Sequence, residues 1–356
     1  MLKHKKNLIA FSIVPQIILL KILTNYPTFV ESIYSHGIYI YISKGMRYAF
    51  GWLPISVGDV LYTLLGLYVI RWFIVNRKRI IQETKQWFLD VLSALSIGYF
   101  AFHILWAFNY YRLPLHESLN IDNDYTTEEL VSLTEQLITK VNTIHLSITT
   151  HDSLKVEMPF TKAEALKMIP DGYDELSKTF PYLAYHPRSI KTSIYSLPLT
   201  YMGFSGYLNP FTNEAQVDGL IPTYKFPTTG SHEVAHQLGY AAENEANFIG
   251  SMAAMQHPDL YFKYSGHAFA LRHCLNEIYR RDLEVYKTIL PKLNIGVLKN
   301  YKEVSDFWNA YENPTEPIFK STYNNFLKAN NQSSGMQSYS YIVALLVNYY
   351  KSNPMD

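Results

Sequence analysis

The residues that most clearly point to chemistry lie between Gly230 and Gly239, where the chain reads Gly-Ser-His-Glu-Val-Ala-His-Gln-Leu-Gly. His232 and His236 are four positions apart, so on a helix both imidazoles lie on one face and can bind a single zinc ion. Glu233 follows the first histidine directly, where its carboxylate can take a proton from zinc-bound water without binding the metal itself. The spacing predicts a hydrolytic zinc centre with Glu233 as the general base.

A catalytic zinc with two histidine ligands needs a third protein ligand and an open position for water. The chain turns at Gly239, and a second helical stretch then brings two carboxylates back, Glu243 and Glu245. Because they are two positions apart, they point in directions about 200° apart, and only one is expected to face the metal. We favour Glu243, since Asn247 follows it on the same face and can bond the second nitrogen of a ligand histidine. Glu245 is the alternative. The expected zinc ligands are His232, His236 and Glu243.

The motif resembles the gluzincin pattern, in which H-E-x-x-H is followed by E-x-x-A-D. Here the second part reads Glu243-x-x-Ala246-Asn247, with Asn in place of Asp, and an unusually tight turn joins the two helices. More specifically, the chain resembles an uncharacterised bacterial family of membrane-anchored proteins regarded as zinc metallopeptidases. The resemblance spans most of the chain, and its segments are 25–27, 54–59, 109–112, 209–212, 232–248 and 264–266. It implies membrane anchoring and a zinc-dependent peptidase, but no particular substrate.

The composition excludes several other classes of site. A net charge of +1 gives no basic surface for nucleic acid. The single cysteine, Cys274, excludes an internal disulfide and a cysteine-rich zinc site. We therefore expect zinc as the cofactor and a protein or peptide of the cell envelope as the substrate. The lipid bilayer is the other expected partner, and no nucleic acid is expected to bind.

Three apolar stretches in the first third of the chain approach the length needed to cross a bilayer. They cover about residues 8–24, 57–75 and 87–108, and only Asp90 and His103 interrupt the apolar character of the third. The first follows a run of lysines, as a signal peptide would, but no small-x-small cleavage site comes after it. We therefore expect three transmembrane helices, the first of them uncleaved.

The basic residues predict the orientation of these spans. Lysines precede the first span, and basic residues cluster in the 76–86 loop. Residues 25–59, in contrast, contain only two lysine or arginine residues, Lys44 and Arg47. By the positive-inside rule, the N-terminus and the 76–86 loop are cytoplasmic. Three spans then place the rest of the chain outside the cytoplasm, on the periplasmic side of a bacterial inner membrane.

The sequence thus predicts two domains and a mainly α (α+β) fold. Residues 1–112 form a membrane domain with three transmembrane helices. Residues 113–356 form an extracytoplasmic, zincin-like metallopeptidase domain that is mostly helical with a small sheet. The apolar and aromatic segment 29–50 is expected to lie along the outer membrane interface as an amphipathic element.

Local patterns predict where elements of the outer domain begin. Thr126 and Thr161 are each followed three positions later by Glu, which is the capping box that opens a helix. Residues 189–196 predict a strand, 199–222 predict hairpins and loops, and only helices are expected after Asp259. The resemblance to zincins implies that an edge strand of this sheet pairs with an extended peptide substrate, which β-augmentation would hold by its backbone.

Two other functions are compatible with an H-E-x-x-H motif. One is a non-catalytic membrane sensor or assembly factor with a structural zinc site, and Glu233 argues against it because a structural site does not need that carboxylate. The other is a protease whose motif lies inside a transmembrane helix. The polar residues around the motif, such as Ser231, Gln237 and Asn244, would be costly in hydrocarbon, so this reading is rejected.

The group that stabilises the oxyanion of a hydrolytic transition state is not settled by the sequence. Tyr240, Tyr264, His267 and His273 lie near the motif and can donate hydrogen bonds. Each is more often a packed side chain than a catalytic one. Tyr264 is the best of this weak set, and it is not assigned a catalytic role.

Overall fold

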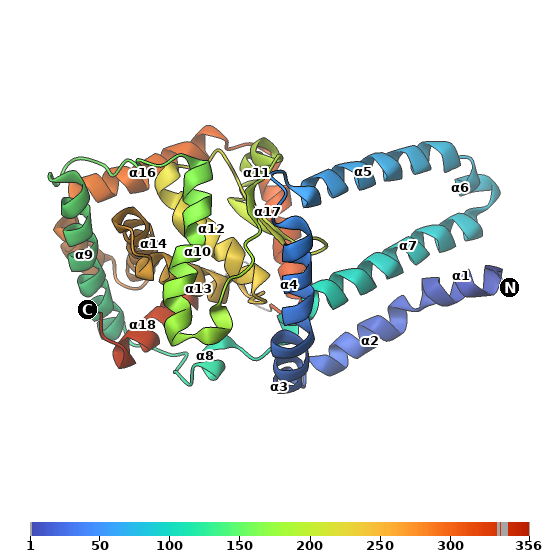
Figure 1. Ribbon diagram of the computed structural model, residues 1–356, viewed down its shortest axis with the longest axis horizontal. Coiled ribbons are helices and arrows are strands. Elements are labelled where there is room, and N and C mark those ends of the chain that lie inside the picture. Colours follow the sequence, from blue (N-terminus) through green and yellow to red (C-terminus); the bar gives the residue numbers. More distant parts are fainter. Residues whose placement is uncertain (1, 333–334, 336–340, 356) are drawn as a thin grey trace.

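Long apolar helices project from one side of a mainly helical body (Figure 1). The computed structural model describes residues 2–332, 335 and 341–355. The projecting helices are α1 (Leu2–Phe11), α2 (Ile13–Leu23), α5 (Val57–Asn76), α6 (Arg79–Gln82) and α7 (Thr84–Leu105). The body holds the other helices and one small sheet, as the expected mainly α fold requires.

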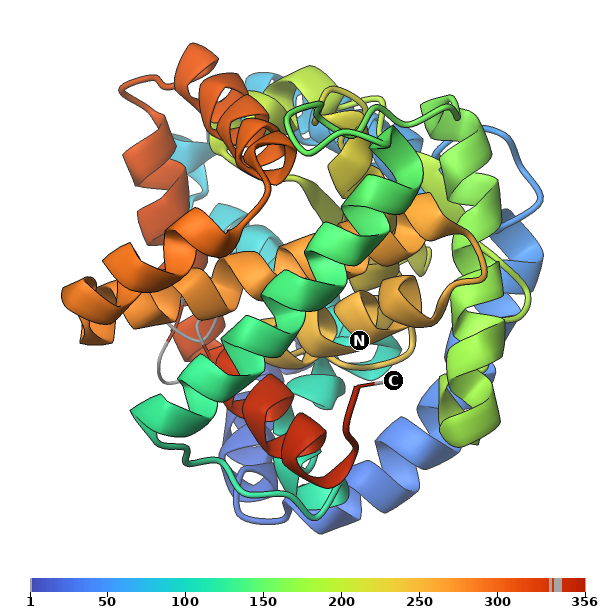
Figure 2. The same cartoon turned by 90° about the vertical axis from the view of Figure 1, so that its left-hand side faces the viewer.

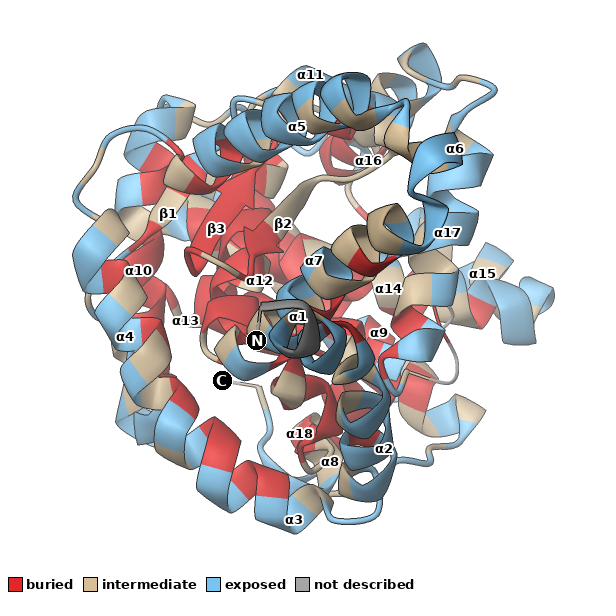
Figure 3. Ribbon diagram, turned by 90° about the vertical axis from the view of Figure 1, so that its right-hand side faces the viewer, coloured by how far each residue is buried: buried red, intermediate tan, exposed pale blue. Residues whose placement is uncertain are grey.

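Three helical segments are long and apolar enough to cross a membrane, namely Lys5–Leu23, Val57–Asn76 and Thr84–Leu105. At most 17% of the residues in their most apolar windows are buried. Figure 3 shows the same contrast, with exposed residues along the projecting helices and buried ones in the sheet and the helices behind it. So much exposed apolar surface suits lipid hydrocarbon and not water, in agreement with the three predicted spans.

Two details differ from the expected spans. The first stretch is divided between α1 and α2 at Ser12, three residues before Pro15, whose ring removes a backbone donor and crowds the preceding turn. The third helix ends three residues short of Phe108. Trp106 leaves helical geometry with φ −157°, and Ala107–Tyr111 form a short 3-10 helix, η2, whose aromatic residues are largely buried. The exit from this span is therefore part of the packed body.

The segment 29–50, expected to be an amphipathic element at the membrane interface, is helical, and one of its faces is buried. It forms α3 (Pro27–Phe29), the π-helix η1 (Val30–Ile38) and α4 (Tyr39–Phe50). Tyr39, Ser43 and Arg47 recur every four residues and are all buried. Arg47 Nη1 donates to the carbonyl of Pro187 at 3.1 Å, so this face packs on the body. Figure 1 shows the segment standing between the body and the projecting helices.

The sheet has three strands in the described part of the chain, in the order β1-β3-β2. They are β1 (Ile190–Thr192), β2 (Gly206–Asn209) and β3 (Glu214–Val217), with β1 parallel and β2 antiparallel to β3. The β2–β3 hairpin lies where hairpins were expected. The strand predicted over 189–196 is shorter, because Ser193 Oγ accepts a bond from Tyr195 N at 3.0 Å and the chain turns into α11 (Ser196–Met202).

Hydrogen bonds join the sheet to the first turn of α5. The buried carboxylate of Glu214 accepts hydrogen bonds from the backbone of Val57 (3.2 Å) and Gly58 (2.5 Å), in the first turn of that helix. A carboxylate is favourable there because the first turn has free N–H groups and carries partial positive charge. Glu214 also pairs with buried Lys191. The second span therefore begins on the same sheet that flanks the motif helix.

Helices α12 (Phe226–Gln237) and α13 (Glu243–Gln256) form the centre of the body. They pack against each other and against α14 (Leu260–Arg281), while the sheet packs against α12.

Both capping boxes are confirmed, since Thr126 and Thr161 open α9 (Thr127–Thr149) and α10 (Lys162–Thr179). In Figure 2, α9 crosses the end of the body that faces away from the projecting helices. Beyond residue 259 the described chain contains helices only, as expected: α14, α15 (Leu283–Ile289), η5 (Leu290–Lys292), α16 (Ile295–Ala310), α17 (Glu316–Ala329) and α18 (Ile342–Ser352). The remaining short helices are α8 (Leu115–Ser118), η3 (Pro181–Leu183) and η4 (Thr223–Lys225).

Candidate metal centre

The H-E-x-x-H motif lies in the second half of α12, which ends in a tight turn. Pro227 occupies the first turn, where its missing N–H costs no helical bond. Gly239 has φ +94°, a left-handed conformation that glycine adopts without a steric penalty. The chain reverses over Tyr240–Ala242, and α13 begins at Glu243. This turn brings the first residue of α13 back to the end of α12 that carries the motif.

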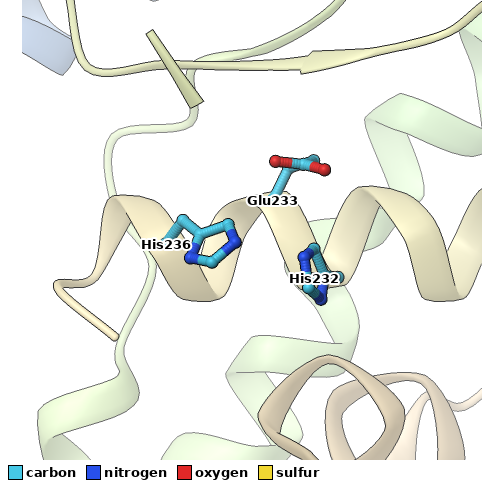
Figure 4. A group of neighbouring side chains, drawn as sticks. All are labelled: His232, Glu233 and His236. Carbon is cyan, nitrogen blue, oxygen red and sulfur yellow. The ribbon is translucent and has the colours of Figure 1, made fainter. Parts of the chain in front are cut away.

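Three side-chain atoms converge beside α12. Figure 4 shows the two imidazoles on one side of the helix, and their ring centroids are 4.6 Å apart. The Glu243 Oε2 atom lies 3.3 Å from His232 Nε2 and 3.7 Å from His236 Nε2. His232, Glu233 and His236 can also each offer a ligand atom within 4.8 Å of the others. The donors expected from the sequence are therefore neighbours in space.

The chemistry of this donor set fits a zinc ion. A tetrahedral zinc with bonds of about 2.0–2.1 Å to nitrogen and oxygen has ligand atoms roughly 3.3 Å apart. The distances from Glu243 to the two histidines are close to that spacing. Glu243 Oε2 is also buried and makes no well-formed hydrogen bond among the described residues, so its charge needs a cation beside it, either a protonated imidazole or a metal ion.

The charges of the three donors depend on one another. Burial alone would raise the pKa of Glu243, but the two imidazoles hold it well below its usual range. Burial lowers the pKa of His236, yet the Glu243 carboxylate outweighs this effect and raises that pKa to about 9. In the metal-free site Glu243 is thus ionised and an imidazole shares a proton with it. A zinc ion would replace that proton.

The Glu233 carboxylate is buried and projects away from the two imidazoles in Figure 4, although one of its oxygens lies within 4.8 Å of a ligand nitrogen of each histidine. It points toward the extended chain above the helix in Figure 4. A Cβ atom on Gly206 of β2 would lie 2.6 Å from Glu233 Oε1, so only glycine leaves room for the carboxylate. Its Oε2 atom is buried without a partner in the described chain. Burial raises the pKa of Glu233 to about 7, and an adjacent cation would lower it again.

The alternative ligand, Glu245, is engaged elsewhere. Its Oε1 atom accepts a hydrogen bond from the backbone of Leu115 at 2.7 Å, and the guanidinium of Arg112 is its nearest opposing charge. It therefore ties α13 to the segment that follows the third span. The role expected for Asn247 is not seen: the second nitrogen of His236 bonds the carbonyl of Tyr240 at 2.7 Å. His232 Nδ1 and Asn247 Nδ2 are both buried without a partner in the described chain.

A residue that the sequence did not point to holds the candidate third ligand. The hydroxyl of Tyr323, on α17, donates to Glu243 Oε1, the oxygen that faces away from the histidines. Such a bond orients a carboxylate ligand and leaves its other oxygen for the metal. Tyr323 is 80 residues from Glu243 in a helix with no motif of its own, so no local signal could have found it.

Segments next to the spans hold the turn that follows the motif. Trp106 Nε1 donates to the carbonyl of His236 at 3.0 Å, and Tyr39 donates to that of Gln237 at 2.9 Å. Arg112 Nη1 donates to the carbonyl of Gly239 at 2.9 Å. The carbonyl of His236 also accepts a hydrogen bond from the backbone N–H of Gly239 at 3.0 Å, so these side-chain donors add to the bonds that the turn makes itself. The ligand His236 is thus positioned by residues on the N-terminal side of the predicted domain boundary at 112.

The structure places the candidate oxyanion donors in other roles. Tyr264 is fully buried and its hydroxyl donates to Asn300 at 2.8 Å. The ring of Tyr240 lies under Arg112, at 4.1 Å from the guanidinium carbon. His267 Nδ1 bonds a backbone carbonyl in its own helix at 2.8 Å. His273 lines a separate cavity. The geometry therefore gives none of the four an oxyanion role.

Comparison with known proteins shows to which family the chain belongs. The family model described as a protein of unknown function, DUF3810, matches residues 34–347. The chain belongs to the DUF3810 family. No curated protein and no solved structure matches it. The DUF3810 match covers both the juxtamembrane segments and the motif, in line with a resemblance over most of the chain, but the family description assigns no activity. This member of the DUF3810 family thus has a group of residues that could hold a metal ion.

Proposed function

We propose that this protein is a membrane-anchored, zinc-dependent peptidase. Zinc would be held by His232, His236 and Glu243, and Glu233 would be the general base. The active site would face the periplasm, with a protein or peptide of the cell envelope as the substrate. The observation that carries the proposal is the convergence of two imidazole nitrogens and one carboxylate oxygen beside a second buried carboxylate, whose Oε2 has no partner among the described residues.

Each residue would have a distinct task in hydrolysis. Zinc held in this site supplies a Lewis acid, which lowers the pKa of water and polarises a peptide carbonyl. Glu233 takes the proton of the attacking water and delivers it to the leaving amine. The Tyr323 hydroxyl keeps one oxygen of Glu243 turned away from the histidines. The carbonyl of Tyr240 fixes the ring of His236 through Nδ1, leaving Nε2 free to bind.

A buried ion pair is the simplest competing explanation of the same contacts. It would account for Glu243 and one protonated imidazole. It would not require a second imidazole, nor a second buried carboxylate with one oxygen unpartnered in the part of the chain that the structure describes. Two imidazoles, two carboxylates and one shared space are instead the parts of a hydrolytic zinc centre.

Substrate trapping in cells tests the proposal. Envelope proteins and their new N-termini are compared between cells carrying the wild type and cells carrying Glu233→Gln, with the exposed Glu284→Gln as a control. We expect one or more envelope proteins to stay uncut only with Glu233→Gln. If all three strains give the same N-termini while the purified proteins hold zinc, the site is structural and the sensor or assembly factor becomes the better reading.

A further inference from the structure

A second cavity lies one helical turn from the candidate ligands. Its volume is about 300 Å³, within the range of small-ligand sites. It is lined by the N-terminal end of α12, by α14 and by α16. Thr228, in its wall, precedes His232 by four residues, which places the two on one face of α12 about 6 Å apart along the axis. One residue of the cavity wall therefore lies on the same face of α12 as the histidines.

The cavity wall joins aromatic rings to basic side chains. The aromatic part consists of Tyr224, Phe269, Tyr301 and Trp308. The basic part consists of Lys225, Arg272 and His273. No aspartate or glutamate lines the cavity among the described residues. Glu303, the acidic neighbour on α16, is paired with Lys155 at 3.0 Å and lies outside the lining.

The basic side chains have no anionic partner within the protein. In the described part of the chain, none of the three forms an ion pair, and Arg272 only lies over the ring of Tyr301, at 5.0 Å. Burial without a counter-charge lowers the pKa of Lys225 to about 8. Burial, together with the charges of Lys225, Arg280, Arg272 and His232, lowers the pKa of His273 to about 4. At neutral pH His273 is therefore uncharged, and Lys225 and Arg272 supply the positive potential that a bound anion would balance.

We propose that this cavity is a specificity pocket that binds a carboxylate of the peptide substrate. Arg272 and Lys225 would hold the carboxylate, and the aromatic rings would pack on the apolar part of the same residue. The carboxylate is either an Asp or Glu side chain or the C-terminal carboxylate of a short peptide. The claim that the bound carboxylate belongs to a substrate rests on the proposed function. The claim that the cavity binds a carboxylate does not.

The test is peptide binding to the full-length Glu233→Gln protein in detergent, measured by calorimetry. One pair of probes, N-acetyl-Phe-Ala-Glu-amide and N-acetyl-Phe-Ala-Gln-amide, isolates the side-chain carboxylate. The other pair, N-acetyl-Phe-Ala-Leu with a free or an amidated C-terminus, isolates the terminal carboxylate. We expect the acidic member of at least one pair to bind about tenfold or more tightly, as a charge-assisted hydrogen bond would give.

Variants on α14 locate the bound carboxylate. Arg272 is exposed, so Arg272→Gln should fold and should abolish the preference, whereas Arg280→Gln, which lies outside the cavity, should keep it. Lys225→Met provides a second variant within the cavity. Chelator-treated protein should keep the preference too, which separates the cavity from direct binding to a metal.

Either of two results would overturn the pocket: equal binding within both pairs, or a preference that survives both Arg272→Gln and Lys225→Met. The pocket and the proposed function can fail separately. If acidic probes bind in the cavity but the wild type cuts no peptide, only the peptidase fails. If the wild type cuts peptides without regard to charge, only the pocket fails.

Discussion

At the scale of single residues, the two carboxylates of the first turn of α13 have different environments. Glu243 has one oxygen beside both histidines and the other bonded by Tyr323. Glu245 is bonded by the backbone of Leu115, near Arg112. Their environments favour Glu243 as the third ligand, as its position before Asn247 also predicted.

This difference gives a direct prediction of zinc content. Glu243→Gln should lose most of the bound zinc from the full-length protein in detergent, because the amide cannot supply the anionic ligand. Glu245→Gln should keep about one zinc per chain, although its unfolding temperature should fall because a buried charged hydrogen bond is weakened. Metal analysis by mass spectrometry measures both. Zinc loss from Glu245→Gln and not from Glu243→Gln would reverse the assignment.

Some residues of the candidate site can be predicted from local sequence, and others depend on how distant helices pack. His232, Glu233 and His236 are recognisable because helical spacing alone places them, and Glu243 follows because the turn at Gly239 is short. Tyr323 could not be predicted, because its contact with Glu243 depends on how α17 packs. The cavity beside Thr228 was also missed, since helices from three parts of the chain build its wall.

At the scale of elements, the segments beside the spans are part of the site's support. The turn after α12 receives hydrogen bonds from Trp106, Tyr39 and Arg112. The sequence predicted an amphipathic element over 29–50 and a third span that ends near residue 108. It could not predict that both would bond the carbonyls at the end of the motif helix, because those contacts span more than a hundred residues.

Trp106→Phe tests this support. Phenylalanine keeps an aromatic ring in the buried position but removes the side-chain donor to the carbonyl of His236, which keeps its bond from the backbone N–H of Gly239. We expect a loss of about 0.5–1.5 kcal/mol of stability, the value of one hydrogen bond, and weaker zinc retention against a chelator. Trp52→Phe is the matched control, since Trp52 is exposed and bonds only its own helix end. Equal unfolding temperatures and equal zinc release in both variants would show that the contact from Trp106 does not support the site.

At the scale of the whole molecule, three apolar helices project from the face of the body nearest the motif turn (Figure 1). The lengths of these helices were largely predictable, because apolar runs are a property of local sequence. Their ends were less so: the third helix stops at Trp106, whose ring is buried near His236. The fit of the body onto the spans places the candidate site close to the predicted membrane surface.

The basic residues of the 76–86 loop predict the orientation in the membrane, and reporter fusions test that prediction. A reporter that is active only outside the cytoplasm should be active when fused at residue 356. A reporter active only inside should be active when fused after Arg79. Both activities are measured in whole cells. An inside signal at residue 356 would place the site in the cytoplasm and exclude envelope proteins as periplasmic substrates.

The central claim is that Glu233 is a base beside a zinc ion and not a structural carboxylate. Turnover of a cleaved peptide is compared between full-length wild type and Glu233→Gln at equal zinc content. Glutamine keeps the shape of the side chain and cannot accept the proton. We predict unchanged zinc content and a fall in kcat of roughly 10²–10⁴-fold, the range for losing a positioned acid–base group. Full activity in the zinc-loaded Glu233→Gln protein would contradict the account.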